Sequence, residues 1–203
     1  MVCVPFFFGL REISGLRQWA PPHMRDDFSR FELVAASMWR SSTAVLGYTT
    51  DKEVRLSFII NVRGHAGTPL PEGFYGNAFA YSTAATTAGE LCGGGLGHTL
   101  ELVKKAKSAV TYDYLLSVAD LMSVDFGWGE AVYGGPAKGG EGPIPGVANY
   151  FLWSKNGKGE EGTLVPISLP KNVMERFQLE VAGLRPSSIG ALRDNPKINV
   201  CVI

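Results

Sequence analysis

Cysteine is scarce in this sequence of 203 residues, which contains only Cys3, Cys92 and Cys201. Their number is odd, their spacing is wide and no Cys-x-x-Cys pair occurs, so neither a disulfide framework nor a zinc site is expected. We predict no metal ligands, and the sparse cysteines fit a protein of the reducing cytoplasm.

An excess of charge of one sign is also lacking, because 19 basic residues balance 19 acidic residues. A balanced chain has no electrostatic footprint for nucleic acid and no attraction to an anionic membrane surface. No apolar run is long enough to span a bilayer. The apolar stretch 1–9 lacks the basic region of a signal peptide and ends at Arg11 and Glu12. We therefore predict a cytoplasmic protein with no nucleic-acid partner and no membrane partner.

What the sequence does contain is an ordinary globular composition, with 45 % hydrophobic and 19 % charged residues. The length suffices for one domain, or for half of a larger two-lobed protein. Periodicity and turn residues predict strands over 1–9, 53–63, 74–81, 147–153 and 163–169, and helices over 9–19, 31–46, 96–109, 111–122 and 172–184. This mixture predicts an α/β or α+β fold.

Two helix patterns are specific enough to be compared with a structure. Ser29 and Glu32 fit the S-x-x-E capping box, which predicts that a helix begins there. In the segment 9–19 the apolar residues recur at every third position, which we interpret as one buried helix face. Its members are Leu10, Ile13, Leu16 and Trp19.

Residues 125–146 are rich in glycine and proline, which predicts a long irregular loop. The loop begins with a D-F-G-W-G box made of Asp125, Phe126, Gly127, Trp128 and Gly129. With this box, six further segments resemble, in order, the BAHD acyltransferases, above all the branch that acts on benzyl alcohol, methanol and taxane-type alcohols. They are Phe31–Leu33 with Trp39 and Arg40, Asn61–Arg63, Tyr75–Ala78, Thr86–Gly89, Leu100–Lys105 and Met174–Phe177.

The resemblance covers residues 4 to 184 and implies the C-terminal lobe of a two-lobed, chloramphenicol-acetyltransferase-like fold, with a mixed sheet and flanking helices. We expect this lobe over 1–184 and an irregular tail over 185–203. By family, the implied function is alcohol O-acylation, with acyl-CoA as cosubstrate, an alcohol as acceptor and no bound cofactor. An N-terminal lobe of the same family is the candidate protein partner.

Two departures from the family pattern change the expected activity. The family's catalytic H-x-x-x-D motif belongs to the N-terminal lobe, and a segment that the family carries before the box is missing ahead of Asp125. We therefore expect a fragment that is inactive alone, and we assign no catalytic residue. The alternatives are a non-catalytic CoA-binding or interaction protein, or the product of a truncated gene model.

His23 and Asp27 fit H-x-x-x-D as a spacing, but the pair stands in a connection just before the capping-box helix. No glycine follows Asp27, as one usually does in the family's motif. Two fixed residues occur together often by chance, so we interpret His23 as a loop residue and not as the general base.

The CoA and acyl channel has five candidates in this sequence. Ser29 and Arg30 begin a helix whose free N–H groups suit a phosphate, although the capping box alone explains Ser29 fully and is the favoured interpretation. Tyr75, Gly76 and Asn77 follow a loop, where they either line the channel or only order the loop.

The D-F-G-W-G box is expected to be structural, since its glycines permit tight turns around a buried indole. A buried Asp125 needs a cation. We predict an ion pair between Asp125 and Arg63, because Arg63 ends the neighbouring strand.

Overall fold

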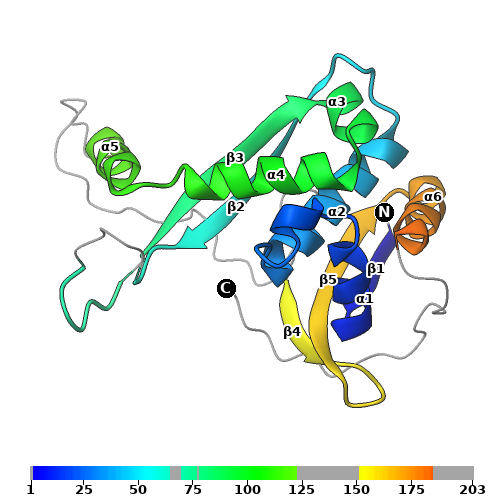
Figure 1. Cartoon of the computed structure of the whole chain (residues 1–203), viewed down its shortest axis with the longest axis horizontal. Helices are drawn as coiled ribbons and strands as arrows, with labels where there is room; N and C mark the ends of the chain where they lie inside the picture. The colour runs from blue at the N-terminus through cyan, green and yellow to red at the C-terminus, as the bar shows by residue number, and fades with distance from the viewer. Residues whose placement is uncertain (1, 65–69, 77, 123–150, 185–203) are drawn as a thin grey trace.

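The computed structural model describes residues 2–64, 70–76, 78–122 and 151–184 of the chain (Figure 1). The predicted α/β class is confirmed by the order of its elements. These are β1 (Val2–Phe8), α1 (Leu10–Arg17), a 3-10 turn (Pro22–Met24), α2 (Arg30–Leu46), β2 (Glu53–Asn61), β3 (Phe79–Thr87), α3 (Ala88–Gly93), α4 (Gly95–Ser108), α5 (Tyr112–Met122), β4 (Leu152–Lys155), β5 (Glu161–Leu169) and α6 (Lys171–Gly183).

Helix α2 is the centre of the packing and contacts α1, α3, α4 and α6. It begins at the predicted capping box and ends at Gly47, whose φ of 68° is the left-handed conformation that glycine adopts without strain. Leu33, Val34 and Ala36 are fully buried along it. The two sheets lie on different sides of α2 (Figure 1).

Strand β5 is the middle of the first sheet and pairs antiparallel with β1 and β4. Pro5 stands opposite Pro166 in this sheet. Because neither residue has an N–H, they can only form a non-hydrogen-bonded pair, in which the backbone groups point away from each other. The nitrogen of Pro5 therefore faces the outer edge of β1, where it interrupts the row of donors that could recruit another strand.

Gly162 has no room for a side chain, since a Cβ there would lie 2.7 Å from the carbonyl oxygen of Phe8 and against the ring of Phe7. We expect Gly162→Ala to lower the free energy of unfolding by about 1–3 kcal/mol, because β1 must shift to make room. Urea unfolding measures this change. The matched variant Gly157→Ala, in the open β4–β5 turn with no atom within 4 Å, should be neutral. Equal effects of the two variants would contradict the clash.

Strands β2 and β3 form the second sheet, a long antiparallel hairpin. The predicted alternation along β2 is confirmed, with Val54, Phe58 and Ile60 buried. The described strands pair only antiparallel, in place of the mixed sheet that the family resemblance implied. The five-residue connection between β4 and β5 allows only a hairpin, whereas parallel neighbours need a long crossover.

The structure corrects two local predictions. The strand predicted over 74–81 begins at Phe79 and continues to Thr87. Of the helix face predicted over 9–19, only Ile13 and Leu16 are buried, while Leu10 is 72 % exposed and Trp19, which lies beyond the end of α1, is 53 % exposed. Each step of three residues falls about 60° short of a full turn, so Leu10 is rotated away from Leu16 by about 120° around the helix axis.

None of the helices in the described part of the chain is both long enough and apolar enough to cross a membrane. The D-F-G-W-G box and the predicted tail 185–203 lie outside the described residues.

Candidate functional site

The start of α2 is closed by its own residues. The Ser29 N–H donates to a Glu32 carboxylate oxygen at 2.6 Å, and the Ser29 hydroxyl donates to the same oxygen at 2.7 Å. In return, the Glu32 N–H donates to the Ser29 hydroxyl at 3.3 Å. The predicted capping box is therefore confirmed, and the Ser29 side chain is already occupied by capping.

Two lysines of α4 reach this helix start. The Lys107 ammonium lies 3.2 Å from Glu32, whose side chain is only 4 % exposed. Lys104 pairs with Asp27 at 3.4 Å and stands 5.1 Å from the centre of the Phe28 ring. Lys104 and Lys107 of α4 are thus anchored by carboxylates at the start of α2.

Arg30 is the first residue of α2, and its side chain is exposed. With Lys104 and Lys107 it places three cations around the beginning of the helix. The neighbouring carboxylates of Asp27 and Glu32 neutralise much of this charge. A phosphate here would therefore be held chiefly by Arg30 and by the free N–H groups of the first turn.

The second candidate group lies in the connection between β2 and β3. The Arg63 guanidinium donates to the carbonyl oxygen of Gly76, so the structure brings these two predicted residues together. Tyr75 beside them is fully exposed. Asn77 lies outside the described residues, as do Asp125, Phe126, Gly127, Trp128 and Gly129. The Asp125–Arg63 ion pair and the scaffold role of the box stay predictions.

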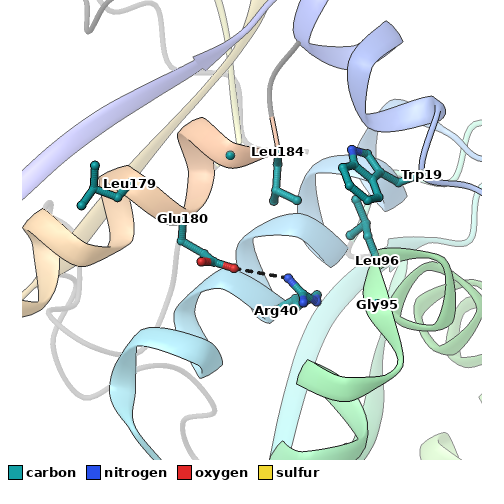
Figure 2. Close-up of a pocket in the computed structure, with 8 residues that line it drawn as sticks. Trp19, Arg40, Gly95, Leu96, Leu179, Glu180 and Leu184 are labelled. Atoms are coloured by element: carbon teal, nitrogen blue, oxygen red, sulfur yellow. Dashed lines mark hydrogen bonds and ion pairs between the residues drawn. The ribbon is translucent and has the colours of Figure 1, made fainter. Parts of the chain in front are cut away.

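A cleft of about 240 Å³ lies between α2, α4 and α6 (Figure 2). The Arg40 guanidinium donates to Glu180 at 3.3 Å and to the Cys92 carbonyl at 3.1 Å. Among the described residues, no acceptor meets the buried Nε of Arg40. Trp19 and Leu184 form apolar walls, so the cleft combines a cation with apolar surface.

The thiol of Cys92 is not activated by this arrangement. Burial raises the pKa of the Cys92 thiol, the nearby Arg40 cation acts in the opposite direction, and the Glu180 carboxylate raises the pKa further. A thiol held protonated is a poor nucleophile. The sequence did not identify the Arg40–Glu180 pair, because 140 positions separate the two residues. The feature of the sequence that could have indicated this pair is the charged Arg40 within an otherwise buried segment of α2.

None of the described histidines forms a catalytic pair with an aspartate. His23 is exposed in the 3-10 turn, and Asp27, its partner in the H-x-x-x-D spacing, bonds Lys104. His98 is half-buried on α4, and His65 lies outside the described residues. The described part of the chain has an exposed arginine at the start of α2 and a cleft with apolar walls beside Arg40.

The family model and two related proteins that match this chain are transferases. The family model described as "Transferase family" matches residues 9–123, more than half of the chain. Benzyl alcohol O-benzoyltransferase of Nicotiana tabacum is 48 % identical over 209 positions, covering 91 % of this chain and 45 % of that protein. The protein of the same name from Petunia hybrida is 47 % identical over 206 positions, covering 89 % of this chain and 45 % of its own length.

A more distant relative shows that the match is interrupted. Alcohol acyl transferase 1 (allele GSd) of Malus domestica is 38 % identical over 228 positions, covering 99 % of this chain and 47 % of that protein. The aligned positions outnumber the 203 residues of this chain, so the apple protein carries residues without a counterpart here. This agrees with the predicted loss of a segment, whose place before Asp125 stays a prediction.

A solved structure shares the fold. The crystal structure of vinorine synthase superposes with a TM-score of 0.55 at 20 % identity, over 92 % of this chain and 48 % of that chain. This chain thus spans about half the length of the relatives that it matches. Together, the family model, the relatives and the fold show that the chain belongs to the BAHD transferase family.

Proposed function

We propose that this chain forms one side of the reaction channel of an acyl-CoA-dependent alcohol O-acyltransferase. The observation that carries the proposal is the identity of 47–48 % with two benzyl alcohol O-benzoyltransferases over about nine-tenths of the chain. Acyl-CoA is then a cosubstrate, an alcohol is the acceptor, and the chain needs no resident cofactor.

In this reaction the alcohol oxygen attacks the thioester carbonyl, a C–O bond forms and the C–S bond breaks. The alcohol's proton goes to a general base and ends on the CoA sulfur. The family resemblance places that base, a histidine, in the half of the relatives that this chain does not cover. The contribution of this chain is to hold and orient acyl-CoA, while proton transfer needs the other half. We propose accordingly that the chain alone is inactive.

We place the CoA phosphates at the beginning of α2. Arg30 is exposed there and begins a helix of 17 residues. The first N–H groups of a helix have no partner inside the helix, which suits an anion. Lys107 reaches the same helix start, because its ammonium pairs with Glu32 in the first turn of α2. Ser29 keeps its capping role in this proposal, and Arg30 supplies the contact with the ligand.

Arg30→Gln is expected to weaken CoA binding about fivefold, because one exposed charged contact of about 1 kcal/mol is removed. Isothermal titration of the purified chain with CoA measures the change. Arg176→Gln removes an arginine of α6 that is also exposed and should leave the affinity unchanged. If wild type binds no CoA, or if both variants weaken binding equally, the proposed phosphate site is wrong.

The alternative function is that of a non-catalytic CoA-binding protein. It is favoured because the described residues contain no histidine paired with an aspartate. Both functions predict CoA binding, so titration does not separate them. The alternative predicts no ester even when the missing half is supplied, which the transfer experiment below decides.

A further inference from the structure

The outer edge of β2 carries a row of backbone groups that β3 does not use. The Val62 N–H donates to the Ala78 carbonyl at 3.0 Å, which makes that pair hydrogen-bonded. Hydrogen-bonded and non-hydrogen-bonded pairs alternate along an antiparallel register. The even-numbered residues of β2 therefore form the hydrogen bonds to β3. The odd-numbered residues therefore point their N–H and C=O groups away from β3. They are Glu53, Arg55, Ser57, Ile59 and Asn61.

The opposite edge of the hairpin is covered. Tyr81 stands opposite Ile59, so its carbonyl points outward from β3, and the Tyr114 hydroxyl of α5 donates to it at 2.7 Å. Helices α3 and α4 also pack on β3. Strand β2 meets α2 through the rings of Phe58 and Phe31, but this contact lies on the buried face of the strand and not at its outer edge. Among the described residues, the hairpin is thus covered on its β3 side, while the outward backbone groups of β2 meet no described backbone partner.

A two-stranded ribbon with an open edge is only marginally stable, and it pairs readily with another strand. We propose that the β2 edge binds the β2 edge of a second copy of this chain, antiparallel, with the two Ser57 residues facing each other. The product is one continuous four-stranded sheet with the order β3, β2, β2 and β3. This inference is independent of acyl transfer.

The charge pattern of β2 favours its own copy as the partner. Centring the pair on Ser57 uses the full nine-residue strand and leaves no outward N–H without a facing carbonyl. In this register Glu53 faces Asn61 of the other copy, and Arg55 faces Ile59. No like charges oppose each other, and each Arg55 keeps its own Glu53 as ion partner. A register centred on Arg55 would oppose two arginines, so charge selects the first register.

Apolar surface on the exposed face adds to the pairing. Ile59 is 43 % exposed, and on β3 Phe79 and Tyr81 are 41 % and 60 % exposed, with their rings in edge-to-face contact. In the paired sheet, the aliphatic stem of Arg55 from the second copy lies against Ile59. The patch then extends across four strands and is shielded by long side chains.

Ser57→Pro tests this edge directly, because it removes an N–H that points to the second copy and not to β3. We expect wild type to dimerise with increasing concentration in sedimentation velocity between about 1 and 100 µM, and Ser57→Pro to weaken dimerisation at least about tenfold. Thr83→Pro is the matched control. It places proline directly opposite, on the covered side of the hairpin, and should leave dimerisation intact if the hairpin stays folded.

A second measurement keeps the test decisive if proline disturbs the hairpin. In a Cys3→Ser background, Ser57→Cys should form a disulfide between two copies on mild oxidation, since facing residues of a hydrogen-bonded pair lie about 5.5 Å apart. Thr83→Cys should not. A wild type that is monomeric over the whole range, or dimers of Ser57→Pro as tight as those of wild type, overturns the proposal. So does equal cross-linking at 57 and 83.

Discussion

Purified alone, this chain is expected to form no benzyl benzoate from benzoyl-CoA and benzyl alcohol, under conditions in which the tobacco relative is active. Loss of a general base costs about 10²–10⁴-fold in rate. Loss of half of the channel removes the positioning of the alcohol as well. His23 does not replace the base, because it is exposed in a turn and its spacing partner Asp27 is bonded to Lys104.

The measurement is ester formation followed by chromatography, with the tobacco enzyme as positive control. A His23→Ala variant of this chain should equal wild type at the uncatalysed background. Ester above background that is lost in His23→Ala would assign catalysis to His23 and contradict the division of labour proposed above.

A fusion then separates acyl transfer from simple CoA binding. The part of the tobacco enzyme that this chain does not match is joined ahead of residue 1, with the unmatched internal positions restored from the same enzyme. We expect ester formation by this fusion and none when the family's catalytic histidine in the added half is replaced by alanine. A folded fusion that binds CoA and forms no ester favours the non-catalytic alternative.

Local chemistry explains why parts of this fold could be predicted. The capping box at Ser29 depends on residues within a few positions, and it is found as expected. The start of β3 was misplaced by five residues because Phe74 is apolar yet exposed in the connection. A side chain's polarity does not reveal whether a partner strand extends far enough to pair with it.

Contacts between distant segments could not be predicted in the same way. The pairing of β1 with β5 joins the two ends of the described chain, and the Arg40–Glu180 pair joins α2 to α6. Such contacts depend on tertiary packing and leave no periodic pattern. In the described part of the chain, the channel candidate Gly76 is linked directly to Arg63, the predicted ion partner of Asp125. Ser29 and Arg30 belong to the separate start of α2.

Phe177→Ala is expected to cause the largest loss of stability among the substitutions considered, about 3–5 kcal/mol. Phe177 is 0 % exposed, and its ring meets Phe6 edge-to-face at 5.2 Å, which fixes α6 on β1. The substitution removes a whole ring from a site closed by a helix and a sheet. Both limit collapse into the cavity, so most of its cost remains.

Urea unfolding of Phe177→Ala should show a lower midpoint with an unchanged slope. Leu179→Ala is the matched control, because it shortens a side chain two positions along the same helix that is 75 % exposed. It should change the free energy of unfolding by less than about 0.5 kcal/mol. Since α6 ends at the cleft that contains Arg40 and Glu180, loosening α6 should also weaken that ion pair. A loss in Phe177→Ala no larger than in Leu179→Ala would show that the Phe6–Phe177 contact does not hold α6 on the first sheet.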